Sequence, residues 1–283
     1  SHKLSEVLEY AKRVVVLIDG NLASDVSTDG LDRSSLTNLL MNHERAAAHA
    51  DAADASAARE PGRVAIRVRG AVTGALGPVD LDIHEGEVIG IGGLPGSGLH
   101  DLGFLLVGEK RPERGTVEIE PGVRTALVPP HRETQGGFDD WTVMENATTS
   151  SLPRWRGLGR LLSPNRELVA AQQVVEELAV EPPDAGARFG SLSGGNKQKV
   201  IFARALFSEA RVLVLCEPTR GVDITTRREI YALIRRQAAA GIAVVVLSSD
   251  AEDLLSVSDR LTVILDSSLR EPRSVAEFTT AEL

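Results

Sequence analysis

The chain has 283 residues, of which 42% are hydrophobic and 25% charged, a composition that is typical of folded globular domains and excludes a mainly disordered chain. Its net charge of −9 argues against a basic surface for nucleic acid, and its single cysteine, Cys216, excludes an internal disulfide. Its apolar runs are far shorter than the roughly 20 residues that cross a bilayer. We expect a reducing, cytosolic compartment.

The first 44 residues predict a small α/β segment. Apolar residues recur at helical spacing in residues 4–13, and the run at 14–18 predicts a buried strand that ends in a tight turn. Residues 31–41 predict a short closing helix. Residues 45–62 consist almost entirely of Ala, Asp, Ser, Arg and His, which indicates a linker, with an exposed Ala-rich helix as the alternative for part of it.

Residues 63–283 alternate between predicted strands and helices. Residues 64–68 and 79–83 alternate apolar and polar side chains, which indicates an antiparallel β layer at one edge. Strands are expected at 87–92, 116–119, 125–128, 212–215, 243–247 and 261–265, with helices at about 97–107 and 224–240. Residues 131–205 are predicted to be mainly helical, with Ser163 and Pro164 opening one helix. This pattern predicts a mostly parallel α/β core with a helical insertion.

A glycine-rich turn between a predicted strand and a predicted helix contains Gly93, Gly96, Ser97 and Gly98. Backbone N–H groups there can surround a phosphate, although glycines in such turns often only allow a positive φ. The full phosphate-loop pattern continues with Lys and then Ser or Thr, where this chain has Leu99 and His100. Losing a charge-assisted hydrogen bond of about 1.5–3 kcal/mol weakens binding roughly ten- to a hundredfold. We therefore predict weak nucleotide binding at this loop.

Two further motifs follow in a fixed order. The run Leu-Ser-Gly-Gly-Asn-Lys-Gln, which contains Ser193, Gly194 and Gly195, precedes an amphipathic helix at 200–207. These three residues can bind a phosphate at a helix N-terminus, or serve only as an N-cap. Glu217, at the end of a strand, can act as a general base toward water, or only cap that strand. Asp223 lies six residues further on and, taken alone, can be an ordinary turn residue.

On these motifs the chain resembles the ATP-binding cassette (ABC) ATPases. LSGGNKQ looks like their signature motif, and LVLCEPTRGVD looks like the Walker B strand and the D-loop. The chain is further similar to the double-cassette ATPases of bacterial monosaccharide importers of the ribose, xylose and galactoside kind. That likeness rests on Asn196, Arg220, the phosphate loop without lysine, and Ser248-Ser249 where other cassettes have Ser-His.

The resemblance implies a P-loop NTPase fold and a particular domain order. The fold would have a RecA-like, mostly parallel core, an antiparallel β edge layer and a helical subdomain at about 131–205. Residues 63–283 would form the second cassette of such a protein, residues 1–44 the C-terminal tail of a preceding cassette, and 45–62 the linker. His2 would be the switch histidine of that preceding cassette.

The departures from the family pattern all fall on one site. Cys216 stands where the Walker B Asp steadies magnesium, and Ser249 replaces the switch histidine. Pro130 and His131 depart from the glutamine loop. The nucleotide-binding positions of this weakened site would be Gly93, Gly96, Ser97, Gly98, Leu99, His100, Cys216, Asp223 and Ser249. Glu217 would be the catalytic residue of this weakened site and would contribute little to ATP hydrolysis.

The signature, in contrast, is intact. The resemblance therefore implies that Ser193, Gly194 and Gly195 act across a dimer interface on ATP held by the preceding cassette, and that Asp223 of the D-loop also makes a contact across that interface. ATP and Mg would be bound mainly there and only weakly here, and the isolated cassette would be weak or inactive as an ATPase. We predict no resident metal, although His100, Cys216 and Glu217 leave a zinc or copper site as the alternative.

The same resemblance implies an ATPase component that energises carbohydrate import from the cytoplasmic face of the membrane, as a peripheral protein. Its partners would be the preceding cassette of the same polypeptide, membrane permease subunits and, indirectly, a sugar-binding receptor, with no nucleic acid. The permease would dock around residues 132–146, where Phe138 and Trp141 are either apolar contacts or subdomain core. The alternatives are a catalytically silent regulatory cassette and a soluble cassette protein of translation or DNA repair.

Overall fold

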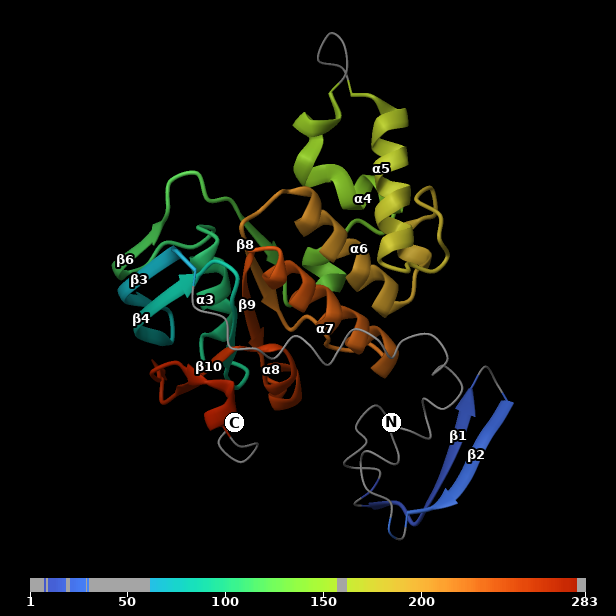
Figure 1. Cartoon of the computed structure of the whole chain (residues 1–283), viewed down its shortest axis with the longest axis horizontal. Helices are drawn as coiled ribbons and strands as arrows, with labels where there is room; N and C mark the ends of the chain where they lie inside the picture. Colours follow the sequence, from blue (N-terminus) through green and yellow to red (C-terminus); the bar gives the residue numbers. More distant parts are fainter. Residues whose placement is uncertain are drawn as a thin grey trace. The chain divides into compact units, whose positions relative to one another are not determined.

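The computed structural model describes residues 8, 10–18, 21–28, 30, 62–156 and 162–278, and the chain divides into two units, 1–57 and 58–283. In the first unit, β1 (Arg13–Ile18) and β2 (Asn21–Ser27) form an antiparallel hairpin (Figure 1). Val15 is 50% exposed, so the prediction of a buried strand at 14–18 is wrong at this position. The hairpin has only two strands, and no further strand of the described residues in this unit covers Val15.

Several predictions for the N-terminal part lie outside the described residues. They are the position of His2, the helix at 31–41 and the linker up to residue 61.

The second unit is built on a sheet of seven strands (Figure 1). The parallel strands are β10 (Arg260–Leu265), β5 (Val88–Gly92), β9 (Ala243–Ser248), β8 (Val212–Cys216) and β7 (Thr125–Val128), in that order across the sheet. The short strands β11 (Ser268–Leu269) and β12 (Arg273–Ser274) pair antiparallel with β10. Every residue of β5, β8 and β9 is buried, as expected for parallel strands that are covered on both faces.

An antiparallel layer of three strands forms a second sheet, in the order β4 (Leu76–His84), β3 (Val64–Thr73) and β6 (Arg114–Ile119). Buried and more exposed residues alternate along β4, so one face of this layer packs on the core. The predicted antiparallel edge layer is confirmed.

The parallel sheet separates two hydrophobic cores. Along β8, Val212, Val214 and Cys216 face the core that is shared with the antiparallel layer and helix α3 (Leu99–Leu106). Leu213 and Leu215 face the opposite core, which is shared with helices α6 (Gly194–Phe207) and α7 (Ile224–Ala239). Successive side chains of β8 therefore point to opposite faces of the sheet, into one core and then the other.

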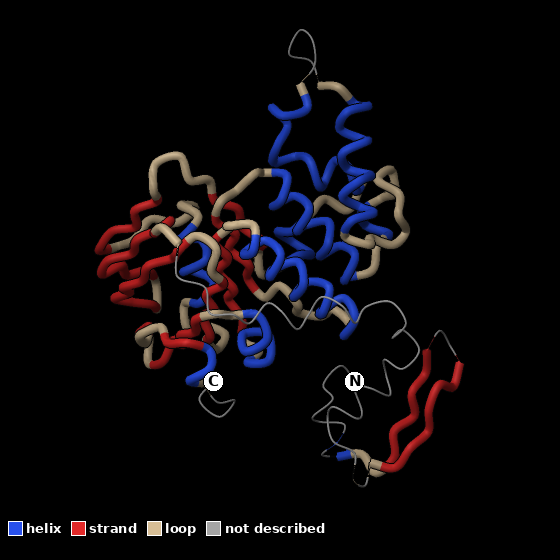
Figure 2. Tube along the Cα trace, viewed as in Figure 1, coloured by secondary structure: helices blue, strands red, loops and turns tan. Residues whose placement is uncertain are grey.

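The part of the chain between β7 and β8 is helical, and its helices lie apart from the sheets (Figure 2). They are the π-helix η1 (Arg132–Gly136), α4 (Val143–Thr148), η2 (Thr149–Trp155), α5 (Pro164–Glu177), η4 (Phe189–Ser191) and α6. Thr142 and Glu145 form a capping box at α4, and Pro164 opens α5 as the sequence predicts. The helix predicted at 200–207 begins six residues earlier, at Gly194, because the Ser193 side chain caps its N-terminus. The short α8 (Ala251–Val257) follows β9, and η5 (Val275–Glu277) lies near the C-terminal end.

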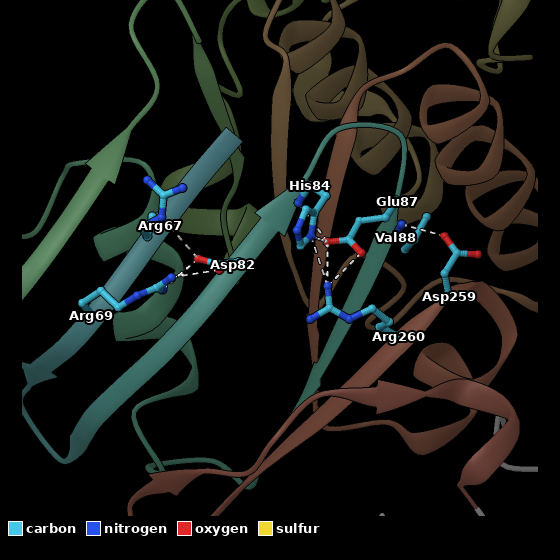
Figure 3. Close-up of polar contacts among 8 residues, drawn as sticks. All are labelled: Arg67, Arg69, Asp82, His84, Glu87, Val88, Asp259 and Arg260. Carbon is cyan, nitrogen blue, oxygen red and sulfur yellow. Dashed lines mark hydrogen bonds and ion pairs between the residues drawn. The ribbon is translucent and has the colours of Figure 1, made fainter. Parts of the chain in front are cut away.

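Charged side chains fix the amino ends of the central strands (Figure 3). The Glu87 carboxylate lies between His84 at the end of β4 and Arg260 at the start of β10, at 3.0 Å from His84 Nδ1 and 3.1 Å from Arg260 Nη1. The Asp259 carboxylate accepts a hydrogen bond of 2.8 Å from the N–H of Val88. These contacts stabilise the amino ends of β5 and β10, opposite the carboxyl ends of the same strands. None of the described helices is long and apolar enough to cross a membrane.

Candidate functional site

The segments that the sequence singles out meet at the carboxyl edge of the parallel sheet. The glycine-rich turn follows β5, Pro130 and His131 follow β7, Glu217 follows β8, and Ser249 follows β9. Because these four strands are parallel, their carboxyl ends lie along the same edge. This is where open α/β sheets bind their ligands.

The glycine-rich turn has the backbone shape of a phosphate cradle. Gly98 is the N-cap residue of α3 with φ at 89°, and a Cβ there would lie 2.6 Å from Cβ of Leu76. A Cβ on Gly93 would lie 2.7 Å from Oγ of Ser97. The Ser97 hydroxyl is buried and has no hydrogen-bond partner among the described residues. Backbone and hydroxyl therefore fit a phosphate group.

The two residues that follow this turn do not supply what a nucleotide site needs. Leu99 stands at the lysine position, is only 4% exposed, and packs into the core beneath α3. His100 Nε2 is buried and lies 3.8 Å from Glu217 Oε1, too far for a direct hydrogen bond. The His131 ring stands edge-on to the His100 ring, with centroids 6.0 Å apart. An aliphatic side chain thus replaces the lysine that would bind phosphate, and an imidazole replaces the hydroxyl ligand of magnesium.

Glu217 is held firmly at this edge. Its φ is 49°, which is uncommon for a residue with a side chain, and its Oε1 accepts a 3.0 Å hydrogen bond from the N–H of Ser249. Burial raises the pKa of Glu217, but the nearby His100 imidazole and the hydrogen bonds from Ser249 outweigh it, so that the pKa lies below its usual range. Glu217 is therefore a fixed carboxylate.

Cys216 faces away from the open side of this edge. The residue is fully buried, and a Cβ on Gly103 of α3 would lie 2.7 Å from its Sγ. Burial, and secondarily the charge of Glu217, raise the pKa of Cys216 to about 12, so the thiol is neutral at physiological pH.

Two positions at this edge, His100 and Cys216, do not supply the oxygen ligands that Mg²⁺ prefers. A magnesium ion prefers carboxylate, hydroxyl and water oxygens in octahedral geometry, whereas the two positions in question hold a buried neutral thiol and an imidazole. Within residues 62–156 and 162–278, the structure shows no group of three His, Cys, Asp or Glu side chains that could hold a metal ion.

The second candidate surface is formed by Ser193, Gly194, Gly195 and Asp223, which we call the signature face. Ser193 Oγ accepts a 3.0 Å hydrogen bond from the Asn196 side chain at the N-terminus of α6. Asp223 caps α7 by accepting a 2.9 Å hydrogen bond from the N–H of Thr226. A Cβ on Gly195 would lie 2.9 Å from Oγ1 of Thr226, so the two helix N-termini lie close together. Hydrogen bonds hold Ser193 and Asp223 at these two helix N-termini, and Gly195 leaves the space for Thr226 between them.

Sequence reasoning assigned no individual role to two residues that organise these loops. Arg132 donates to the backbone carbonyl oxygens of Arg220 and Gly221, at 2.7 and 3.1 Å. Asp253, which is 2% exposed, accepts hydrogen bonds from Thr219, Tyr231 and Ser248. Burial raises the pKa of Asp253 despite these bonds. No local sequence pattern indicated either residue, and the carbonyl partners of Arg132 lie 88 and 89 residues further along the chain.

Phe138 and Trp141 lie at the surface of the helical segment. Their rings stack with centroids 4.3 Å apart, and the residues are 52% and 39% exposed. The alternative that they belong to the subdomain core is therefore wrong.

Comparison with known proteins gives a family for this fold. The family model described as ABC transporter matches residues 76–220. The ribose import ATP-binding protein RbsA 2 of Rubrobacter xylanophilus is 37% identical over 299 residues, which cover 100% of this chain and 55% of that protein. The ribose/galactose/methyl galactoside import ATP-binding protein 1 of Rhizobium meliloti is 32% identical, with 100% and 58% covered. The chain thus spans about half the length of the curated relatives it matches.

Solved structures agree on the fold. A dimeric bacterial ABC transporter cassette aligns with a TM-score of 0.65 at 22% identity, over 75% of this chain and 100% of that cassette. A post-hydrolysis state of an ATP-binding cassette bound to ADP and Pi aligns with a TM-score of 0.63, also at 22% identity. The predicted α/β P-loop NTPase cassette, with its mostly parallel core, antiparallel layer and inserted helices, is confirmed. The chain belongs to the ABC transporter family of ATPases.

Proposed function

We propose that this chain is the second cassette of the ATP-binding component of a monosaccharide importer, and that it acts mainly by completing the ATP site of the preceding cassette. The names of its relatives support sugar import, and ribose or galactosides are the substrates in those names. The share of the relatives that the chain spans supports a preceding cassette in the same polypeptide. Residues 1–44 would then be its tail and 45–62 the linker.

The observation that carries the proposal is the contrast between two surfaces of one cassette. At the carboxyl edge, the lysine position is a core leucine, Leu99, and the metal-facing positions hold His100 and the buried thiol of Cys216. On the signature face, by contrast, Ser193 and Asp223 each cap a helix and both glycines are present. A cassette that has lost its own site but kept its signature is suited to donate that signature.

The donated surface has the chemistry that a γ-phosphate requires. The first N–H groups of α6 have no partner within the helix, and the helix dipole places partial positive charge at the same end. Ser193 adds a hydroxyl, and Gly194 and Gly195 let the backbone approach a phosphate closely. ATP and Mg would be bound by the preceding cassette, with His2 as its switch histidine, whereas this cassette would bind nucleotide weakly.

The proposed setting is the cytoplasmic face of the membrane. Permease subunits would dock on the helical segment, where the stacked pair of Phe138 and Trp141 offers an exposed apolar contact. A sugar-binding receptor would act through the permease, and nucleic acid would play no part because the chain is acidic.

Titration of the purified chain with Mg-ATP tests the weakened site. We expect a dissociation constant above about 100 μM, because the missing lysine alone weakens binding roughly ten- to a hundredfold. Because the donor set does not fit Mg²⁺, removal of the metal with EDTA should change that constant by less than about threefold. A low-micromolar constant that depends on Mg²⁺ would contradict the proposal.

A further inference from the structure

Three segments far apart in the sequence meet at the guanidinium of Arg132, the first residue of η1. Nη1 donates a 2.7 Å hydrogen bond to the carbonyl oxygen of Arg220, and Nη2 donates one of 3.1 Å to that of Gly221. Both acceptors belong to the loop between β8 and α7. The same guanidinium lies against Gly194, the first residue of α6.

The glycines at these positions leave the space that the guanidinium occupies. A Cβ on Gly194 would lie 2.7 Å from Nη2 of Arg132, and a Cβ on Gly221 would lie 3.1 Å from it. Gly221 also has a φ of 64°, which favours glycine. Gly194 therefore has a role inside this chain, in addition to any approach by a phosphate.

The orientation of the guanidinium is fixed by its neighbours. Arg132 Nε donates to Glu133 Oε1 at 3.2 Å, and Lys197 Nζ of α6 lies 4.0 Å from the other oxygen of Glu133. The Arg132 side chain is only 19% exposed, so water screens its contacts partially. A planar guanidinium can donate to two adjacent carbonyl groups at once, which a lysine cannot match in geometry.

Two contacts thus join the N-terminus of α6, which carries Ser193, to the loop and helix that follow β8, which carry Asp223. Arg132 joins the loop at Arg220 and Gly221 to the N-terminus of α6, and Thr226 of α7 packs on Gly195. A catalytic or binding site must hold its functional groups within about 0.5 Å of the productive geometry. Ser193 lies on α6 and Asp223 at the end of the loop, so their relative position depends on these contacts.

We propose that Arg132 is a positioning residue, which holds the loop of residues 219–223 against the N-terminus of α6 so that Ser193 and Asp223 meet the partner's nucleotide as one preassembled surface. The catalytic consequence rests on the proposed donor function. The contact itself belongs to this chain and can be tested without ATP.

Hydrogen–deuterium exchange on the purified chain tests the contact. Arg132→Met keeps much of the side-chain volume but removes the donors, so amides of residues 191–198 and 217–224 should exchange at least about tenfold faster. Arg132→Lys should give an intermediate increase. Strands β5 and β9 should change less than about twofold in both variants. Arg124→Ala, which removes an exposed ion pair with Glu209, is the matched control and should leave both segments unchanged.

ATP hydrolysis by the double-cassette protein with its permease tests the consequence. Arg132→Met should lower kcat about 10- to 100-fold while KM for ATP changes less than about threefold, because the nucleotide is held by the other cassette. Arg132→Lys should retain an intermediate kcat. Unchanged exchange in the two segments overturns the contact, and faster exchange with unchanged kcat overturns the positioning role. If Ser193→Ala also leaves kcat unchanged, the donor function fails, while the exchange result still decides the contact.

Discussion

Replacing Ser193 by alanine in the complete double-cassette protein should lower ATP hydrolysis at least about 100-fold, whereas Glu217→Gln should leave it within about twofold. Removing one donor that stabilises developing charge costs roughly 10²–10³ in rate, and in the proposed function the Ser193 hydroxyl is such a donor toward the γ-phosphate of ATP on the preceding cassette. Glu217 is a fixed carboxylate, but it faces a site that lacks the lysine and the magnesium ligands. Steady-state hydrolysis in the presence of permease measures both effects.

Two features of the chain make this comparison well controlled. Ser193 is also the N-cap of α6, and loss of a cap alone costs about 1 kcal/mol of stability. Asp250→Ala removes the N-cap of α8, outside the helical segment on which the permease would dock, so it should destabilise similarly and leave hydrolysis within about twofold. Glu217→Gln keeps the size of the side chain and an oxygen to accept the Ser249 N–H. If Glu217→Gln abolished hydrolysis as fully as Ser193→Ala, this cassette would be catalytic in its own right.

Restoring the phosphate loop should restore nucleotide binding. In the double variant Leu99→Lys and His100→Thr, we expect Mg-ATP to bind the purified chain about 10- to 100-fold more tightly, because the lysine adds a charge-assisted hydrogen bond and the threonine adds a magnesium ligand. Titration calorimetry measures the change. The variant should also be less stable, since Leu99 packs in the core and its burial contributes about 1.5–3 kcal/mol.

A volume-conserving variant separates these two effects. Leu99→Met should alter stability by less than about 1.5 kcal/mol and leave the affinity for Mg-ATP unchanged. A folded double variant that binds Mg-ATP no better than the natural chain would show that something other than the missing lysine and hydroxyl weakens the site.

Much of the cassette fold could be predicted from the sequence, because its central strands are continuous apolar runs bounded by turns. The strand predicted at 125–128 has the same bounds as β7, and the one at 243–247 differs from β9 by one residue. The same kind of run at 14–18 lies in a two-stranded hairpin where Val15 is half exposed. An apolar run alone does not distinguish a central strand from a hairpin strand.

The candidate site was partly predictable as well. Glycine patterns located the phosphate loop and the signature, and the alternation along β8 places Cys216 on the same side as Val214, away from the opposite core. Arg132 could not be found in this way, because its two carbonyl partners lie 88 and 89 residues further along the chain. Contacts of that range depend on how loops come together, which local patterns do not encode.

The number of nucleotides trapped in the transporter tests the donor account most directly. The double-cassette protein with its permease would be incubated with radiolabelled Mg-ATP and vanadate, freed of unbound nucleotide, and assayed for ADP per polypeptide. If this cassette only completes the site of its neighbour, about one nucleotide is trapped per polypeptide, and Ser193→Ala abolishes the trapping. Two trapped nucleotides per polypeptide, or trapping that persists in Ser193→Ala, would contradict the account.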